Sequence, residues 1–265
     1  MIGIISSTLD VASSNMAERL LENSGFEPHT VNGKEGFRNG KLFLLRLNSP
    51  LISAEIDSFG FEVAYFLSKH KSANNVPALT THSLGNWTAD AKIGGKPHEL
   101  SVAAPVQMLG ALRGISDIEV HIEKTYEATH HGPLLKTPSL FVEIGGDDSM
   151  IQNRELARRL AESMYASLLQ EEDFEKCVIG IGSNHYPEKF TKLALQKGYA
   201  FSHIIPKHAI LNEDGSDNLV MLEQAIGRSK SPIDSAVVDW KSINAAIKNR
   251  VVEELNRIGL DHEKV

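Results

Sequence analysis

The chain has 265 residues, 42% of them hydrophobic and 23% charged, which is the composition of an ordinary soluble globular protein. No apolar run approaches the roughly 18–20 residues that a membrane-spanning helix needs, so no membrane partner is expected. The single cysteine, Cys177, excludes an intrachain disulfide and fits a reducing cytoplasm. A formal net charge of −7 argues against general binding of DNA, although lysine and arginine outnumber aspartate and glutamate by eight to six between residues 30 and 100.

Apolar strand patterns alternate with helical patterns along the chain. Strands are expected at residues 2–6, 42–45, 61–67, 76–81, 118–126, 140–146, 177–181 and 236–239. Helices are expected from a cap at Asp10 or Ser13 to about residue 23, and at 99–113, 151–170, 187–197, 219–227 and 242–258. The alternation predicts a single domain over residues 1–265 with loop insertions. Its fold class is expected to be α/β, a three-layer α/β/α arrangement around a central, mostly parallel (mixed) sheet.

Two adjacent histidines form the most conspicuous motif, Glu127-Ala128-Thr129-His130-His131-Gly132-Pro133. The Gly-Pro pair ends the strand expected at 118–126, because proline lacks an amide donor and restricts the residue before it. Neighbouring residues of an intact strand point to opposite faces, so both imidazoles can share one centre only where the strand breaks. The alternative is one buried, hydrogen-bonded histidine beside one exposed histidine.

Further residues able to do chemistry stand in or directly after other expected strands. His82 follows strand 76–81, Glu143 lies in strand 140–146, and His185 follows strand 177–181. The carboxyl ends of parallel strands share one edge of a sheet, so we expect these residues and the histidine pair to converge there. Imidazoles with carboxylates, and without cysteine, suit a catalytic zinc that keeps an open position for water. Each histidine taken alone is also compatible with an ordinary polar residue.

Several familiar catalytic motifs are absent from the sequence. His98-Glu99 does not continue as an HExxH helix, and neither a GxSxG elbow nor a Walker A loop occurs. The glycines of residues 180–185 are similar to a dinucleotide-binding loop, but His185 occupies the place of the third glycine. We therefore discard the dinucleotide interpretation.

Five blocks of the sequence occur in the order of one known family. The blocks are Thr81-His82-Ser83-Leu84-Gly85-Asn86-Trp87, Glu127-Ala128-Thr129-His130-His131-Gly132-Pro133, Phe141-Val142-Glu143-Ile144-Gly145, Gly180-Ile181-Gly182-Ser183-Asn184-His185-Tyr186 and His203-Ile204-Ile205-Pro206-Lys207. In these blocks the chain resembles the archaeal and plant-type D-aminoacyl-tRNA deacylases (D-tyrosyl-tRNA deacylases), and the resemblance runs from Ile2 to Lys241. It implies a cytoplasmic, zinc-dependent, monomeric hydrolase that cleaves the ester between a D-amino acid and the 3′ end of tRNA. It also implies the three-layer α/β/α fold that nucleoside phosphorylases and peptidyl-tRNA hydrolases share.

The chemistry of such an ester hydrolysis assigns roles to particular side chains. Zinc lowers the pKa of bound water to about 7 and polarises the ester carbonyl, so zinc-activated water is the expected nucleophile. The expected zinc ligands are His82, His130, His131 and His185. Glu143 or Glu127 is expected to act as the general base or as a further ligand.

A second set of residues is expected to bind the substrate. The lysines of this set would contact phosphates, and the glycines would let the backbone approach the terminal adenosine. One of the aromatic residues would stack on the base, and the asparagine belongs to the same block as the tryptophan. The expected substrate-binding residues are Lys69, Asn86, Trp87, Gly180, Gly182, Tyr186 and Lys207.

Three other functions fit parts of this pattern. A zinc-dependent peptidase or amidohydrolase of similar α/β/α fold would use the same histidines, and only substrate assays separate it from an esterase. A nucleoside phosphorylase-like enzyme needs an arginine cluster for phosphate, and only Arg46 and Arg113 stand near the expected site. A non-catalytic module that binds the acceptor end of tRNA would tolerate loss of the histidines and should be more basic than this chain.

Overall fold

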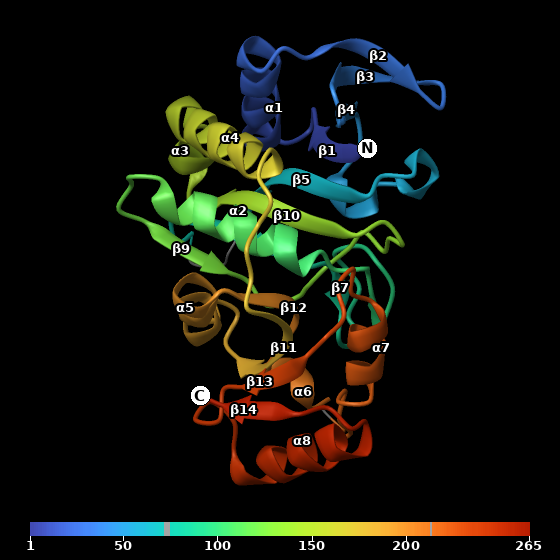
Figure 1. Cartoon of the computed structure of the whole chain (residues 1–265), viewed down its shortest axis with the longest axis vertical. Helices are drawn as coiled ribbons and strands as arrows, with labels where there is room; N and C mark the ends of the chain where they lie inside the picture. The colour runs from blue at the N-terminus through green and yellow to red at the C-terminus, as the bar shows by residue number, and fades with distance from the viewer. Residues whose placement is uncertain (72–74, 213) are drawn as a thin grey trace.

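The computed structural model describes residues 1–71, 75–212 and 214–265, and the strands of these ranges form two main sheets (Figure 1). The first described sheet has eight strands, in the order β2 (Glu27–Val31), β3 (Lys34–Asn39), β4 (Leu42–Leu47), β1 (Ile2–Ser7), β5 (Val63–His70), β10 (Ser139–Gly145), β6 (Ala78–His82) and β9 (Glu123–Tyr126). The second has four, in the order β12 (Tyr199–Pro206), β11 (Lys176–Ser183), β13 (Ser235–Val238) and β14 (His262–Lys264). A short pair, β7 (Gly85–Asn86) and β8 (Glu99–Leu100), lies apart from both.

Strand direction changes inside the first sheet. β4, β1, β5 and β10 run parallel, whereas β6 pairs antiparallel with β10 and carries β9 parallel to itself. All neighbouring strands of the second sheet are parallel. β10 therefore lies between two strands that run in opposite directions, which decides where the functional side chains meet.

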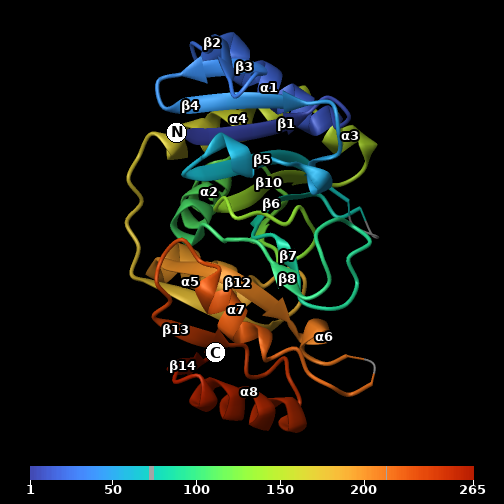
Figure 2. The same cartoon turned by 90° about the vertical axis from the view of Figure 1, so that its right-hand side faces the viewer.

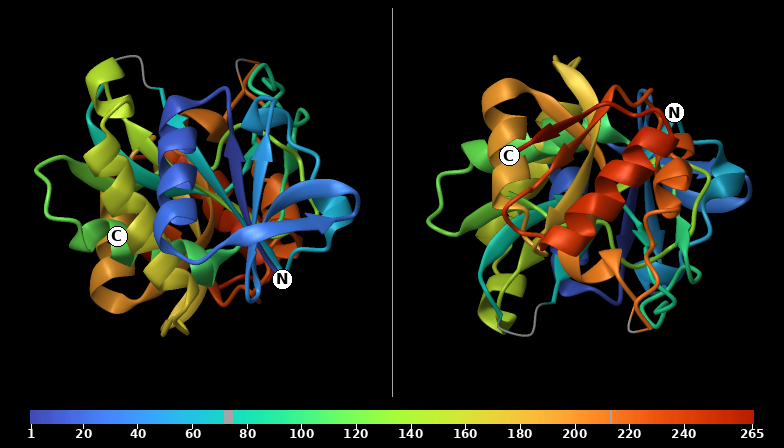
Figure 3. Two further views of the ribbon diagram at one scale, coloured as in Figure 1. Left: turned by 90° about the horizontal axis from the view of Figure 1, so that it is seen from above. Right: turned by 90° about the horizontal axis from the view of Figure 1, so that it is seen from below.

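Helices cover one face of the first sheet and both faces of the second (Figures 1 and 2). α1 (Val11–Asn23) and α2 (Pro105–Asp117) pack on the first sheet, and α4 (Arg154–Leu168) packs on these two helices. α2 and α5 (Glu188–Lys197) pack on β12. Their apolar side chains form one core that includes residues of both sheets. α6 (Lys207–Ile210), α7 (Met221–Gly227) and α8 (Ala245–Arg257) enclose a second core on the other face of the second sheet, where α8 forms one end of the molecule (Figure 3).

Two helices of the first core, α1 and α4, each begin at a residue whose side chain caps the helix. The side chain of Asn153 caps α4 by accepting a hydrogen bond from the backbone amide of Leu156 at 3.0 Å. The apolar residues at every fourth position, from Leu156 to Leu168, are all buried, and each such side chain stabilises the fold by about 1.5–3 kcal/mol. Asp10 caps α1 in the same way, by accepting from the amide of Ser13.

The opposite face of the first sheet is covered by short turns and loops. Phe66 and Phe141 stack there with ring centroids 4.9 Å apart, against Leu51 of the turn η1 (Leu51–Ser53) and Phe59 of η2 (Asp57–Phe59). A further short helix, α3 (Asp148–Ile151), follows β10. Loops cover a sheet less completely than helices do, so cavities remain on this face of the first sheet. The candidate site lies on the same face.

The predicted α/β class with a large, mostly parallel sheet is confirmed. Several predicted bounds are wrong by up to four residues, and two starts are wrong by more: β9 begins at Glu123 instead of residue 118, and α2 begins at Pro105 instead of residue 99. Proline suits the first turn of a helix because it has no amide to donate. The hairpin β2–β3 was not predicted, because most of its residues are exposed and show no apolar alternation.

The organisation of the chain as a single domain stays a prediction. No helix of the described ranges is long and apolar enough to cross a membrane.

Candidate metal and active site

The site forms around Glu143, in the middle of β10. His70 ends β5 and is aligned with Gly145, whereas His82 ends β6 and is aligned with Phe141. Glu143 lies between these two positions and on the same face of the sheet. We expected these side chains to meet at the edge of the sheet that the carboxyl ends of parallel strands share, and this expectation is wrong. The side chains meet over the middle of β10 because β6 runs against β5 and β10.

The motif at 127–133 runs from the first sheet to the second. The amide of Glu127 donates to the carbonyl of Thr81 at 3.0 Å, and the amide of Ala128 donates to the carbonyl of His185 at 2.8 Å. The next amide, of Thr129, donates to the carbonyl of Ile204 in β12 at 3.0 Å. The regular strand has ended at Tyr126, so His130 and His131 both face the same centre, with ring centroids 4.4 Å apart.

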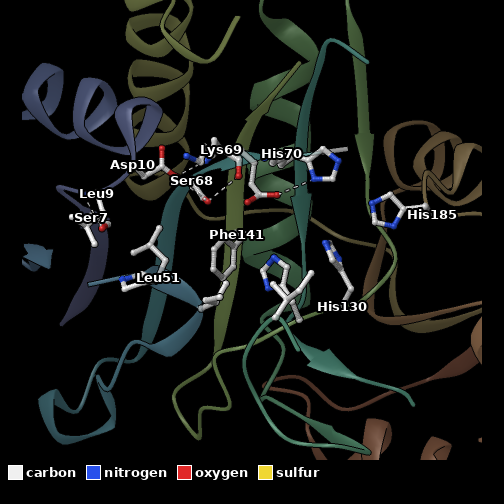
Figure 4. A pocket seen from close by; sticks show the side chains of 16 residues that line it. Ser7, Leu9, Asp10, Leu51, Ser68, Lys69, His70, His130, Phe141 and His185 are labelled. Carbon is white, nitrogen blue, oxygen red and sulfur yellow. Dashed lines mark hydrogen bonds and ion pairs between the residues drawn. The ribbon is translucent and has the colours of Figure 1, made fainter. Parts of the chain in front are cut away.

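Two buried carboxylates connect the imidazoles. Oε2 of Glu127 lies 2.8 Å from Nε2 of His185, 3.1 Å from Nδ1 of His70 and 3.5 Å from Nε2 of His130. Oε2 of Glu143 lies 3.3 Å from Nε2 of His82 and 3.6 Å from Nδ1 of His70. Figure 4 shows His70, His130 and His185 pointing toward one another at one end of a pocket. The structure thus brings together all six predicted metal-binding and acid–base residues.

Backbone carbonyls fix the orientation of three imidazoles. Nδ1 of His82 lies 3.0 Å from the carbonyl oxygen of Ser83, Nδ1 of His130 lies 2.8 Å from that of Ala128, and Nδ1 of His131 lies 2.6 Å from that of Gly132. A carbonyl oxygen only accepts, so each Nδ1 must carry the proton and donate it. In the neutral form of each ring, the Nε2 atom then keeps its lone pair, which is the arrangement that histidine ligands of metals adopt.

Burial and the two carboxylates shift the pKa values of the cluster in opposite directions. Burial, with the nearby positive charge of His82, lowers the pKa of His131 to about 4. Burial also lowers the pKa of His130, and its histidine neighbours lower it further. For His82, burial alone would lower the pKa, but the nearby carboxylate of Glu143 outweighs it and raises the pKa. Burial would raise the pKa of Glu143, yet the close ring nitrogens of His70 and His82 hold that pKa well below its usual range.

The donor atoms are spaced as metal ligands. With bonds of about 2.1 Å and tetrahedral angles, two ligands of one zinc ion lie about 3.4 Å apart. The separations around the two glutamates, from 2.8 to 3.6 Å, bracket that value. Nε2 of His82, both carboxylate oxygens of Glu127 and Oε2 of Glu143 are buried without a hydrogen-bond partner of good geometry in the described chain. Three overlapping groups of donors lie within 4.8 Å: His70, Glu127, His130 and His185; His82, His130 and His131; His82, Glu127 and Glu143.

His70 is a member of this cluster that the sequence analysis does not assign. It ends a buried strand, β5, just as His82 ends β6. The rule that selected the other histidines, their position in or after a strand, therefore applies to His70 as well. Its Nδ1 faces both carboxylates, and its buried Nε2 has no hydrogen-bond partner among the described residues.

Two cavities adjoin the cluster. The larger, of about 690 Å³, is lined by Glu143 and by Lys69, one of the expected phosphate contacts. The smaller, of about 380 Å³, is lined by Asn86 and Trp87. Trp87 is nearly buried, and its indole nitrogen donates to the carbonyl of Ile204 at 3.1 Å, so only part of its ring reaches the cavity. The ring of Tyr186 lies 5.3 Å from that of His185 and 5.9 Å from that of His70, centroid to centroid.

Four expected substrate contacts line neither cavity, namely Gly180, Gly182, Tyr186 and Lys207. A Cβ atom on Gly180 would come within 2.7 Å of the ring of Phe190, and a Cβ atom on Gly182 within 2.9 Å of Ile243. Both glycines therefore allow close packing inside the second sheet, a role that the sequence pattern does not separate from ligand contact. Lys207 is exposed at the start of α6.

Fold and site together define a class, namely a mixed α/β protein with a buried histidine–glutamate cluster that could hold a metal, set between two cavities. Comparison with known sequences then gives the particular family. The chain belongs to the D-aminoacyl-tRNA deacylase family, whose model matches residues 58–263.

Relatives and a solved structure match nearly the whole chain. The D-aminoacyl-tRNA deacylase of Pyrococcus furiosus is 35% identical over 273 residues, which cover 98% of each chain. That of Pyrococcus abyssi is 33% identical over 274 residues, again 98% of each. A crystal structure of a conserved protein of unknown function has a TM-score of 0.88 and 28% identity, and the match covers 100% of this chain and 95% of that one.

Proposed function

We propose that this chain hydrolyses the ester bond between a D-amino acid and the 3′ end of tRNA, releasing the free D-amino acid and tRNA. The observation that carries the proposal is the histidine–glutamate cluster at the junction of two cavities, in a member of the D-aminoacyl-tRNA deacylase family. We further expect the chain to act in the cytoplasm and as a monomer.

The donor set fits zinc, because it combines imidazole and carboxylate groups without a thiolate. The residues that would hold the ion are Glu127, His130 and His185, together with His70, His82 and His131. When bound, zinc would lower the pKa of a water molecule and polarise the ester carbonyl. The carbonyls of Ser83, Ala128 and Gly132 would keep three of the imidazoles oriented before the ion arrives.

Glu143 is the better of the two carboxylates for moving a proton. It lines the larger cavity, whereas Glu127 is completely buried beneath three histidines. The lowered pKa of Glu143 keeps its Oε2 atom ionised at neutral pH, so it can accept a proton from the attacking water. The water oxygen bonds to the ester carbon, the bond to the ribose oxygen breaks, and the proton passes from Glu143 to that ribose oxygen.

Contacts with the tRNA would be few, because the chain carries a net charge of −7. Lys69 lines the larger cavity and would meet a phosphate near the terminal nucleotide. Lys207, exposed on α6, would meet a phosphate farther along the strand. Asn86 and Trp87 line the smaller cavity, and the ring of Tyr186 lies beside that of His185. These three residues would contact the substrate through hydrogen bonds and stacking.

The test is hydrolysis of D-tyrosyl-, D-aspartyl- and L-tyrosyl-tRNA by the purified protein, with the bound metal measured by elemental analysis. We expect both D esters to be cleaved much faster than the L ester. Activity should be lost on prolonged chelation and return when zinc is added. Full turnover by metal-free protein would refute the zinc assignment, and equal rates on D- and L-tyrosyl-tRNA would leave only a nonspecific esterase.

A variant separates the base from the ligands. Glu143→Gln should lower the rate constant by about 10²–10⁴-fold, because the amide cannot accept the proton. The zinc content should stay near that of the wild type if His82 and the other donors suffice to hold the ion. An unchanged rate would assign the proton transfer to another group.

A further inference from the structure

We infer that the smaller cavity receives the aminoacyl group and that the larger cavity receives the terminal adenosine. In this arrangement Ile93 forms the wall between the two cavities and discriminates between the D and L configurations at Cα. This inference rests on the proposed function, because it places the two halves of an aminoacyl ester on the two sides of the cluster. It adds a specificity-determining residue that the hydrolysis itself does not require.

The two cavities share one boundary. Ile93, His130, His131 and His185 line both of them, so the cluster is open to each side. An ester whose carbonyl lies at the cluster must extend its acyl group one way and its ribose the other. Two cavities that meet at the reacting centre provide a separate space for each half.

Size and charge decide which half enters which cavity. The larger cavity extends away from the histidines to Leu9 and Asp10 (Figure 4), and Lys69 and Lys71 stand on its wall. A nucleoside with its phosphate is the larger half of the substrate, and its phosphate is the group that lysines attract. Lys92 lines the smaller cavity, but its amine lies 3.6 Å from the carboxylate of Asp90, which offsets its charge. The inner wall of the smaller cavity includes Ala128 and Ala209, whose short side chains leave room for an amino-acid side chain.

The chain holds Ile93 firmly at this boundary. The amide of Gly132 donates to the carbonyl of Ile93 at 3.0 Å, and the side chain of Asn86 donates to the carbonyl of Gly94 at 2.9 Å. Gly94 and Gly132 pack so closely that an added Cβ atom would come within 2.2 Å of the carbonyl of Ile52 and the amide of Gly95, respectively. The side chain of Ile93 is nevertheless 58% exposed, so a rigid backbone presents an apolar wall to open space beside the cluster.

A rigid wall next to the reacting carbonyl is what a stereochemical filter needs. When the carbonyl and the amine of an aminoacyl ester are fixed, the D and L forms exchange the positions of the hydrogen and the side chain on Cα. A β-branched wall tolerates hydrogen but collides with a side chain. Ile93 is therefore placed to reject one configuration without reading which side chain the amino acid carries.

The first experiment truncates this wall. Ile93→Ala should lower the ratio of D- to L-tyrosyl-tRNA hydrolysis by about 10-fold or more, the range that removal of a few methylene-sized groups produces in a pocket. Ile93→Val, the smaller change, should lower it less. Leu169→Ala, at a similarly exposed leucine outside both cavities, should leave the ratio unchanged. A wild-type ratio in Ile93→Ala with wild-type zinc content would overturn the role of Ile93.

The second experiment fills one cavity at a time. Thr88→Trp narrows the smaller cavity and Leu9→Trp narrows the larger, each from its rim. Thr88→Trp should slow hydrolysis of D-tyrosyl-tRNA at least 10-fold more than that of D-alanyl-tRNA, because only the larger side chain needs the lost space. Leu9→Trp should slow both by the same factor, since both esters carry the same adenosine.

The outcomes separate this inference from the proposed function. The reverse pattern would exchange the occupants of the two cavities and overturn the inference, as would equal effects of Thr88→Trp on both esters. A wild-type protein that cleaves neither D ester would instead refute the proposed function, whatever the variants do.

Discussion

Oε2 of Glu127 lies 2.8 Å from Nε2 of His185, although the two residues follow strands of different sheets. Glu127 comes directly after β9 in the eight-stranded sheet, and His185 follows β11 in the four-stranded sheet. The adjacent amide of Ala128 donates to the carbonyl of His185, so main chain and side chain connect the two sheets at the same point. The cluster is complete only when the two sheets are packed together.

Glu127→Gln should therefore remove metal and activity together. The amide places a nitrogen or a neutral oxygen among His70, His130 and His185, where a charged ligand is needed. We expect loss of zinc by elemental analysis and a fall in rate of several orders of magnitude. Glu123→Gln, at an exposed carboxylate on the preceding strand β9, is the matched control and should behave as wild type.

His70→Ala tests the histidine that the sequence analysis leaves out. If His70 is a ligand, its loss should weaken zinc binding in a competition titration with a chelator and lower the rate by at least about 10²-fold. His29→Ala, at an exposed histidine on β2, is the control. Zinc affinity equal to that of the wild type would reduce His70 to a neighbour of Glu143.

Lys69→Ala should raise KM and leave kcat nearly unchanged, because a phosphate contact holds the substrate and the transition state about equally. One lost phosphate contact should also reduce the salt dependence of log affinity by about 0.7–0.9 per decade of salt. Lys34→Ala on the β2–β3 hairpin is the control. Abolished turnover at saturating substrate would give Lys69 a role in the reaction itself.

Asp57 should contribute to stability at neutral pH and lose that contribution in acid. Burial would raise its pKa, but hydrogen bonds from the amides of Lys136 and Thr137 and from the Thr137 hydroxyl outweigh it and lower the pKa. A lowered pKa in the folded state means that protonation opposes folding, so the contribution is complete above about pH 5 and disappears as pH falls below about 4 toward the folded pKa.

The measurement for Asp57 is urea unfolding between pH 7 and pH 3. Asp57→Asn should lower the free energy of unfolding by about 1 kcal/mol at pH 7, because the side chain is partly exposed to solvent, and by less at pH 3. Asp261→Asn, at an exposed carboxylate, should show no such difference. A destabilisation independent of pH would mean that the charge of Asp57 is not responsible.

Gly94 and Gly33 provide a matched pair for the packing beside Ile93. Their φ angles are 76° and 74°, so alanine brings similar backbone strain at both, about 1–2 kcal/mol. A Cβ atom on Gly33 meets nothing within 4 Å, whereas one on Gly94 comes within 2.2 Å of the carbonyl of Ile52. Gly94→Ala should therefore lower the free energy of unfolding by about 1–3 kcal/mol more than Gly33→Ala. Equal losses in denaturant unfolding would show that the loop moves freely away from Ile52.

Local sequence determined most of the elements of this fold. Short stretches of the chain are enough to predict buried strands such as β1 and β10 and the apolar periodicity of α4. The strand before the histidine pair ends at Tyr126, however, and not at the Gly132-Pro133 pair that was expected to end it. Buried strands and helical periodicity depend on side-chain size, whose effects act within a few residues. The hairpin β2–β3 lies outside this rule, because exposed strands need no apolar pattern.

The sequence also determined which residue types form the site, through the position of His82, His130, His131 and His185 in or after strands. Tertiary structure alone decided how they meet. The reversal of β6 against β10 places His70 and His82 over Glu143, and packing of the second sheet brings His185 to Glu127. Strand direction and sheet packing arise from contacts between residues far apart in the chain, which no local pattern encodes. For the same reason, only the folded chain distinguishes Glu143, which lines a cavity, from Glu127, which is buried beneath the histidines.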